Sequence, residues 1–183
     1  MALQEELEVQ GNKLFRYRSH LPLILLVVSI PVFIYTQLYN NQFEKFISYD
    51  LWEIISFSIC LLGLLVRIYT VGYTPKNTSG RNTTEGQVAD VLNTQGIYST
   101  VRHPLYVGNF FMWLGIAMLV QDIWYMVAFT FIYWVYYERI MFAEEQFLRK
   151  KFGEVYVNWS LKTPAFIPSL KNFSSTDLTF RWK

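Results

Sequence analysis

Apolar residues gather in four runs along the chain. The first two, Leu21–Tyr39 and Leu51–Val71, are uncharged or charged only near their ends, and each approaches the roughly 20 residues that span a bilayer. The third and fourth, Tyr106–Val120 and Ile123–Tyr137, are separated by a short polar break. At ~1.5 Å per residue they rise little more than ~20 Å each, which predicts a tight helical hairpin. The pattern indicates an all-α integral membrane protein with about four transmembrane helices.

Composition agrees with a membrane location. Hydrophobic residues make up 52% of the 183 residues and charged residues 16%, against about 25% charged in a typical soluble domain. The length suits a single membrane-embedded domain over residues 1–183. The net charge of +2 is too small to indicate a nucleic-acid partner. The single cysteine, Cys60, cannot form an intramolecular disulfide, and we expect it to be a packing residue.

The distribution of Lys and Arg predicts the orientation. Fifteen of the 16 basic residues fall on one side of the predicted spans, which the positive-inside rule makes cytoplasmic. Both termini and the long central loop would then face the cytosol, in a bacterial inner membrane or the endoplasmic reticulum. We expect the fourth span to continue into a cytoplasmic amphipathic helix, Glu138–Phe152. The last dozen residues, 172–183, resemble a loosely held tail.

One candidate site is the stretch "GIYSTVRHPLYVGN", Gly96–Asn109. Pro104 suits the first turn of a helix, where its missing N–H costs nothing. Arg102 and His103 would then lie at a helix N-terminus, whose N–H groups form a natural anion site. His103 can donate or accept a hydrogen bond or exchange a proton near neutral pH. The alternative is an ordinary membrane-boundary motif, with a snorkelling Arg and a capping His.

The second candidate is the glutamate pair near the end of the fourth run. Glu144 has Ile140 and Leu148 as its i−4 and i+4 neighbours, and a carboxylate on an apolar face near a bilayer needs a buried partner or a ligand. Glu145 is spaced to pair with Arg149 in a solvated salt bridge. The pair therefore predicts one functional and one structural carboxylate.

Aromatic residues follow this pair at Tyr156, Trp159 and Phe166. They could fold over a flat aromatic ligand, or they could form an interfacial belt. A carboxylate, aromatic rings and an anion-binding helix start suit a zwitterionic adenine cofactor such as S-adenosylmethionine. The nine glycines are never two residues apart, which excludes the G-x-G-x-x-G fingerprint of a Rossmann site.

The motif "GIYSTVRHPLYVG", followed by "EEQFLRKKFGEVYVNW" and "TPAFIP", resembles the isoprenylcysteine carboxyl methyltransferase family and its prokaryotic relatives, which include lipid phosphate methyltransferases. The resemblance covers about Asp90 to Pro168, with cofactor motifs at 90–108 and 138–168. It implies a multi-span methyltransferase that holds S-adenosyl-L-methionine between the loop, the hairpin and the C-terminal segment. The acceptor, a membrane lipid or lipidated molecule, would enter from the bilayer. No metal site is expected.

The resemblance also implies roles for individual residues. As catalytic residues it suggests His103, Arg102 and Arg139. Eukaryotic members of the family have a substrate-binding arginine where this chain has Ile140, and the adjacent Arg139 is turned about 100° away on a helix. The cofactor-binding positions are Asp90, Val91, Leu92, Asn93, Tyr98, His103, Pro104, Leu105, Tyr106 and Glu144.

The sequence leaves two chemical classes of methyl acceptor open. A carboxylate or phosphate oxygen is anionic at neutral pH and needs no general base, whereas an amine would need one. Lys76 and Arg81 in the central loop, with Arg102, favour an anionic head group, and Arg81 and Arg102 are the predicted substrate ligands. The alternatives are a prenylcysteine carboxylate and the head-group phosphate of lipid A or a phospholipid.

Two other classes of function are compatible with parts of the sequence. Sterol-reductase-like membrane proteins bind NADPH and share an RHP-x-Y signature, although their residue before the tyrosine is typically asparagine and here it is Leu105. A non-catalytic membrane scaffold would use the same motifs only structurally. It predicts that alanine at Tyr98, His103 or Glu144 leaves every phenotype intact.

Overall fold

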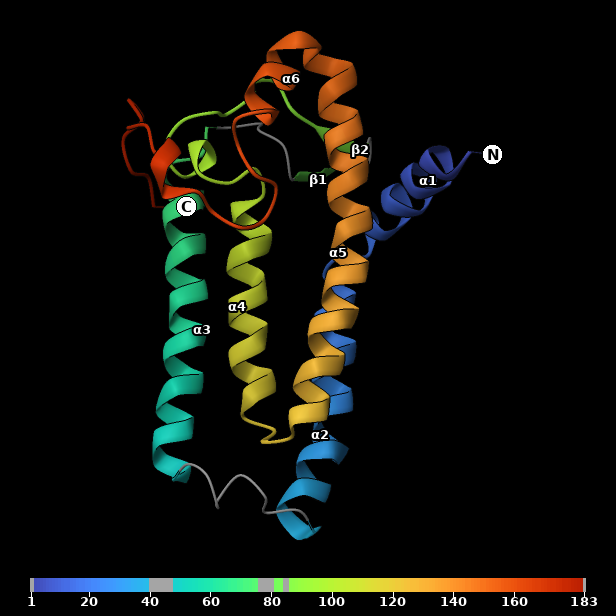
Figure 1. The fold of residues 1–183 in the computed structure, drawn as a ribbon, viewed down its shortest axis with the longest axis vertical. Helices are drawn as coiled ribbons and strands as arrows, with labels where there is room; N and C mark the ends of the chain where they lie inside the picture. The colour runs from blue at the N-terminus through green and yellow to red at the C-terminus, as the bar shows by residue number, and fades with distance from the viewer. Residues whose placement is uncertain (1, 40–47, 76–80, 84–85, 183) are drawn as a thin grey trace. The chain divides into compact units, whose positions relative to one another are not determined.

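A computed structural model describes residues 2–39, 48–75, 81–83 and 86–182; the side chains of residues 81–83 and 86 lie outside the description. The chain is mostly helical, as predicted (Figure 1). Its helices are α1 (Leu3–Arg16), α2 (His20–Tyr39), α3 (Tyr49–Gly72), α4 (Pro104–Met118), α5 (Ile123–Phe152) and α6 (Glu154–Ser160), with short 3₁₀ turns at η2 (Ile97–Ser99) and η3 (Leu170–Asn172).

The expectation of an all-α chain needs one correction. The central loop contains two short strands, β1 (Arg81–Thr83) and β2 (Gly86–Val88), which pair antiparallel with Asn82 opposite Gln87. Strands of three residues give too few alternating positions for a periodic signal in the sequence. The sequence therefore predicts only a loop here.

The hairpin of α4 and α5 follows the predicted runs with shifted boundaries. α4 begins at Pro104, as its fixed φ favours, and ends two residues before the predicted limit. Asp122 starts α5, because its Oδ1 accepts a hydrogen bond from the Tyr125 N–H at 2.7 Å. α5 then runs unbroken for 30 residues, which includes the predicted continuation. Gly153, at φ 54°, follows its last residue.

Two helices are long and apolar enough to cross a membrane. α2 and α3 both reach a mean hydropathy of 2.1 over their most apolar window, whereas α4 is a shorter apolar helix. Only 22% of that window is buried in α2 and 17% in α3. A core helix of a soluble protein would be mostly covered by other elements, so these exposed apolar surfaces are suited to lipid. Among the described residues, two candidate spans are therefore found where four were predicted.

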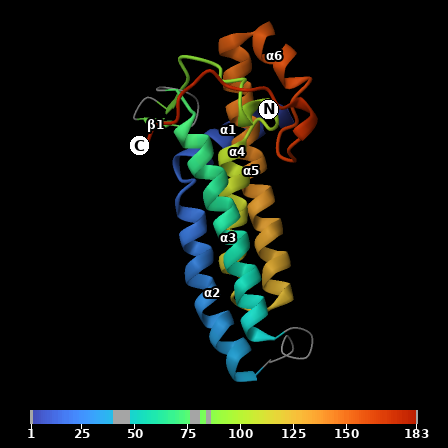
Figure 2. The same ribbon diagram turned by 90° about the vertical axis from the view of Figure 1, so that its left-hand side faces the viewer.

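The described chain divides into two compact units. One comprises Tyr17–Leu65 and Gly108–Val135, and in it parts of α2, α3, α4 and α5 lie side by side (Figure 2). Glycine allows α3 and α4 to approach closely, because a Cβ at Gly63 would lie 2.5 Å from the carbonyl oxygen of Gly108. α5 is tied to α2 by a hydrogen bond of 2.7 Å from the Tyr125 hydroxyl to the Leu25 carbonyl.

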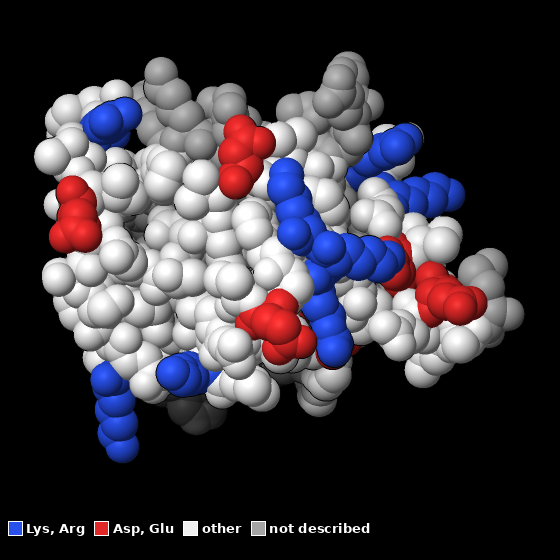
Figure 3. All heavy atoms as spheres, turned by 90° about the horizontal axis from the view of Figure 1, so that it is seen from above, with Lys and Arg blue, Asp and Glu red and all other residues white. Residues whose placement is uncertain are grey.

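The other unit comprises Met1–Arg16, Val66–Val107 and Tyr136–Lys183. In it α1 contacts α5 where Gly11 meets Arg139 and Ala143. The loop that precedes α4 contacts α6 and the C-terminal segment through hydrogen bonds from Trp159 to Tyr98 and from Arg102 to Pro164. The face at the top of Figure 1 carries Lys and Arg side chains interspersed with acidic ones (Figure 3). This unit contains every residue of the candidate site described below.

The prediction of a loosely held tail is wrong. The Gly96 N–H donates to the Ser174 carbonyl at 3.0 Å, and the Arg181 N–H donates to the Gly72 carbonyl at 3.0 Å. The Phe180 ring packs edge-on against Tyr73, with ring centroids 5.4 Å apart. Backbone hydrogen bonds to residues distant in sequence leave no local periodic signal, so the polar composition of this segment was misleading.

Candidate functional site

A narrow cavity in the second unit brings three separate segments together. It is lined by residues of the loop before α4, of α5 and of α6, namely Leu92, Asn93, Tyr98, Arg102, His103, Glu144, Leu148, Tyr156 and Trp159. Its free volume of about 10 Å³ has room for about one water molecule. A larger ligand therefore requires these side chains to move apart.

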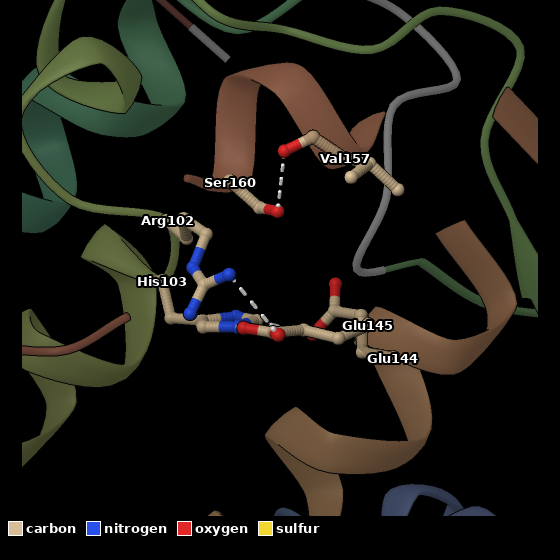
Figure 4. Close-up of polar contacts among 6 residues, drawn as sticks. All are labelled: Arg102, His103, Glu144, Glu145, Val157 and Ser160. Carbon is tan, nitrogen blue, oxygen red and sulfur yellow. Dashed lines mark hydrogen bonds and ion pairs between the residues drawn. The ribbon is translucent and has the colours of Figure 1, made fainter. Parts of the chain in front are cut away.

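A buried cluster of charges forms one wall. The Arg102 and His103 side chains point toward Glu144 and Glu145 on α5 (Figure 4). His103 Nε2 lies 2.9 Å from Glu145 Oε1, and Arg102 Nη1 lies 3.3 Å from Glu145 Oε2. On the other side of the imidazole, His103 Nδ1 lies 3.7 Å from Glu144 Oε2. The two carboxylates thus flank the histidine, and Glu145 joins it to the arginine.

Glu144 is the more deeply buried of the two carboxylates. Its side chain is 7% exposed, against 22% for Glu145. Its Oε2 accepts a hydrogen bond of 3.0 Å from the Tyr106 hydroxyl. Because burying a charge is unfavourable without a partner, Tyr106 and His103 together explain how Glu144 is tolerated there.

Glu145 is held in its ionised form. Burial alone would raise the pKa of its carboxyl, but the hydrogen bond to His103, the charges of His103 and Arg102, and a hydrogen bond from Tyr156 outweigh this and hold the pKa below its ordinary value. The sequence predicted that Glu145 would pair with Arg149. Instead Glu145 faces the cavity wall, and Arg149 is exposed.

The two backbone N–H groups immediately before α4 bond to the C-terminal segment. The Arg102 N–H donates to the Pro164 carbonyl at 2.9 Å, and the His103 N–H donates to the Ala165 carbonyl at 3.2 Å. Pro104 has no N–H to offer. The C-terminal segment therefore uses the two backbone donors that precede α4, and the Arg102 side chain adds a cationic group beside them.

The aromatic residues of α6 cover the cavity. The Trp159 indole N–H donates to the Tyr98 carbonyl at 3.2 Å, and Tyr156 packs with Ala89 and Leu148 in a small buried core. Within α6, the Ser160 hydroxyl donates to the Val157 carbonyl at 2.9 Å (Figure 4). Of the two predicted placements, folding back over a pocket describes Tyr156 and Trp159.

Half of the ten residues predicted for the cofactor line this cavity. Five of them line it: Leu92, Asn93, Tyr98, His103 and Glu144. Tyr106 does not line the cavity, but its hydroxyl donates a hydrogen bond to Glu144, which does. Pro104 is buried and Leu105 half-buried, and neither lines the cavity. Asp90 is exposed and Val91 is 54% exposed. The next two residues of the loop, Leu92 and Asn93, are the ones that line the cavity.

The basic residues predicted for the reaction are distributed differently. Arg102 lines the cavity, whereas Arg139 lies on the face of α5 that packs against α1, where its Nε donates to Gln10 Oε1 at 3.1 Å. Ile140, at the position of the family's arginine, is 0% exposed in the core. Arg81 lies in β1 with its side chain outside the description, and Lys76 lies outside the described residues.

Leu148 was not among the predicted site residues, Glu145 was predicted as a structural carboxylate, and Tyr156 and Trp159 were named only as one of two alternatives. Leu148 lies one helical turn after Glu144, a spacing that places both on one face of α5. Tyr156 and Trp159 have the i, i+3 spacing of a shared helix face. These spacings were available in the sequence, but the fold of α6 back onto the loop before α4 was not.

Known proteins are similar to this chain in sequence. The model of the family described as phospholipid methyltransferase matches residues 51–155. The protein-S-isoprenylcysteine O-methyltransferase of Schizosaccharomyces pombe is 39% identical over 79 residues, which cover 43% of this chain and 33% of that protein. The nickel-cobalt-cadmium resistance protein NccN of Alcaligenes xylosoxydans xylosoxydans is 33% identical over 129 residues, covering 69% of this chain and 56% of that protein.

A solved structure has the same fold. It is described as the eukaryotic intramembrane Ras methyltransferase, isoprenylcysteine carboxyl methyltransferase, and it superimposes with a TM-score of 0.60 at 22% identity. The match covers 82% of this chain and 53% of that one. The chain spans about a third to somewhat over half of the length of these relatives. Among the described residues, no group of three or more His, Cys, Asp or Glu side chains is placed to hold a metal ion.

Proposed function

The chain belongs to the phospholipid methyltransferase family, and we propose that it is an integral-membrane S-adenosylmethionine-dependent O-methyltransferase that acts on an anionic group of a membrane-embedded lipid or lipidated acceptor. The observation that carries this proposal is the buried cluster of Arg102, His103, Glu144 and Glu145 in a cavity covered by Tyr156 and Trp159. Placing two carboxylates around a buried histidine, with one of them paired to a partly buried arginine, is unfavourable as a packing device. A ligand that requires such groups explains their presence.

The residues present fit S-adenosylmethionine. When bound, this cofactor supplies a methyl group activated by a sulfonium. Glu144 would offer its carboxylate to the positive charge of the ligand, and Tyr156 and Trp159 would offer ring faces to the purine. Tyr106 and His103 would hold the Glu144 carboxylate in place. Because the free volume is small, α6 and the α5 side chains would have to separate when the cofactor enters.

The protein groups would mainly orient the reactants and exclude water. A carboxylate or phosphate oxygen is already ionised at neutral pH, so no side chain is needed to remove a proton from it. His103, held between two carboxylates, would position them rather than act as a base. Enclosure by α6 would keep water from competing with the acceptor.

Two chemical classes of methyl acceptor are compatible with the site. The relatives named protein-S-isoprenylcysteine O-methyltransferase favour the carboxylate of a prenylated cysteine. The family description favours a phospholipid, for which the head-group phosphate of lipid A or a phospholipid is the corresponding anion. Arg102 and Arg81 would serve either one.

Transfer of labelled methyl groups tests the proposal. Purified protein in lipid nanodiscs would be supplied with methyl-labelled S-adenosylmethionine and either a farnesylcysteine analogue or anionic phospholipid. We expect label in an organic-soluble product, with a mass increase of one methyl group in place of a proton. A carboxyl ester releases methanol in base, which separates the two acceptors. Folded protein that labels neither acceptor and no lipid of its native membrane would contradict the proposal.

A further inference from the structure

A second and larger cavity lies in the unit that comprises Tyr17–Leu65 and Gly108–Val135. Its free volume is about 540 Å³, which is within the usual range of small-molecule sites. It is lined by residues from the end of α2, the start of α3 and the turn between α4 and α5, namely Phe33, Gln37, Tyr49, Glu53, Leu119 and Gln121. None of these six residues lines the cavity described above.

Hydrogen bonds connect the walls of this larger cavity. The Trp52 indole N–H donates to the Met118 carbonyl at 2.7 Å, which joins α3 to the end of α4. The Gln37 side-chain amide donates to Gln121 Oε1 at 3.4 Å, which joins α2 to the turn after α4. Because both helices are tied to the same turn, the cavity is preformed, as ligand sites usually are.

Gln121 occupies a backbone position that usually selects glycine. Its φ is 59°, in the left-handed region, where Gly or Asn is the common residue after a helix. Gln121 is only 7% exposed, and it lines the cavity. Since a glutamine is unfavourable for this backbone conformation, its presence indicates a use for the side-chain amide.

The lining combines one charge with amides and aromatic rings. Among the described lining residues, only Glu53 is charged. Phe33 and Tyr49 belong to the same lining, and aromatic rings attract ammonium groups, as a carboxylate also does. The Gln37 amide has two N–H groups, of which Gln121 accepts one. The cavity therefore suits a ligand that carries an ammonium group and an oxygen acceptor.

Apolar surface adjoins the cavity on both helices. Leu38 on α2 is 68% exposed, and on α3 Leu51 is 50% and Ile54 is 62% exposed. Both helices are long and apolar enough to cross a membrane, so such surface is suited to acyl chains. A molecule that brings acyl chains, an ammonium group and a phosphate to one place is a zwitterionic phospholipid.

We propose that this cavity binds the head group of a zwitterionic phospholipid. Glu53 would face the ammonium, and the Gln37 amide would donate to the phosphate. Phe33 and Leu119 would contact the apolar part of the lipid. In the orientation predicted from the Lys and Arg distribution, this end of α2 faces away from the cytosol. The bound lipid would be neither methyl donor nor acceptor, and it would stabilise the association of α2, α3 and the turn.

Native mass spectrometry of the full-length protein in detergent tests the inference. Phosphatidylcholine is the probe, because its quaternary ammonium has no lone pair and cannot accept a methyl group. Phosphatidylglycerol with the same acyl chains lacks the ammonium. We expect the wild type to bind phosphatidylcholine more tightly than phosphatidylglycerol. Glu53→Gln should weaken phosphatidylcholine about threefold to fivefold, the upper range for loss of an exposed ion pair, and should not weaken phosphatidylglycerol.

Asp50→Asn is the matched control. Asp50 is an exposed acid on α3 outside the described lining, and its substitution should leave the lipid preference as in the wild type. Equal affinity of the wild type for both lipids, or an undiminished preference in Glu53→Gln, would overturn the inference. So would an equal loss of preference in Asp50→Asn, since the preference would then report only the net charge of this end. Affinity for S-adenosylhomocysteine should be unchanged in Glu53→Gln, and its loss would contradict a separate lipid site.

Discussion

The two faces of α5 within the unit that holds the site use polar residues in opposite ways. One face carries Tyr137, Glu144 and Leu148 toward the loop before α4, and the other carries Arg139, Gln146 and Lys150 toward α1. On the α1 face each polar group meets its own partner, Gln10, Gln4 and Glu8 respectively, at the protein surface. On the cavity face, His103 lies between Glu144 and Glu145, and Glu145 is shared by His103 and Arg102.

The contrast distinguishes the face of α5 that holds α1 in place from the face that would bind a ligand. Surface ion pairs such as Lys150 with Glu8 contribute about 0–1 kcal/mol, so the α1 face derives its fit mainly from close packing at Gly11. Buried charges are unfavourable unless something compensates them. Substitutions on the two faces should therefore affect different measurements, with ligand affinity depending on one and stability on the other.

The largest effect is expected for Glu144→Gln on the cavity face. The substitution keeps the size of the side chain and removes the buried charge that would meet the cationic part of the ligand. Affinity for S-adenosylhomocysteine, measured by calorimetry, should fall about 100-fold, as for the loss of a charged partner. Unchanged affinity in folded Glu144→Gln protein would show that this face does not hold the ligand.

A large effect on stability, and not on ligand affinity, is expected for Gly11→Val on the α1 face. A Cβ at this position would lie 2.1 Å from the Arg139 carbonyl oxygen, so α1 must move away from α5. The free energy of unfolding should fall by about 1–3 kcal/mol, as for an overpacked contact, and affinity for S-adenosylhomocysteine should stay near the wild-type value. Val9→Ala, at an exposed position of the same helix, is the control and should leave the unfolding temperature unchanged.

A smaller effect, on the unfolding temperature, is expected when the pH is lowered. The pKa of Glu145 in the folded protein is lowered below its ordinary value of 4.5, so its contribution to stability is present above that value and is lost as the pH falls through the folded pKa. The unfolding temperature should change little through this group between neutrality and about pH 5 and should decline below it. Glu145→Gln should reduce that decline, and an identical profile in the variant would contradict the assignment.

The smallest effects are expected for Arg139→Ala and Lys150→Ala. Each removes a partly or largely exposed contact with α1, so the free energy of unfolding should change by less than about 1 kcal/mol. Turnover with labelled S-adenosylmethionine should persist in both variants. A large loss of turnover in Arg139→Ala alone would restore Arg139 as the substrate ligand that the family resemblance suggested.

The sequence predicted what depends on local pattern. The apolar runs located α2, α3 and the hairpin of α4 and α5, and Glu144 stood out because an isolated carboxylate on an apolar face requires a reason. α1 was not predicted, because its docking depends on one glycine that fits against Arg139 and Ala143 on α5. The pairing of Glu145 with His103 and the use of the Pro164 carbonyl depend on segments distant in sequence. No local pattern encodes such contacts.

The most direct test of the central claim is to find where the cofactor binds. Ultraviolet cross-linking of radiolabelled S-adenosylmethionine to the purified protein, followed by peptide mapping, identifies the segment in contact with it. The label should appear on peptides that contain residues 92–106 or 144–159, and excess S-adenosylhomocysteine should suppress it. Label confined to α1, α2 or α3, or equal labelling in the presence of the competitor, would contradict the assignment of this cavity as the methyl-donor site.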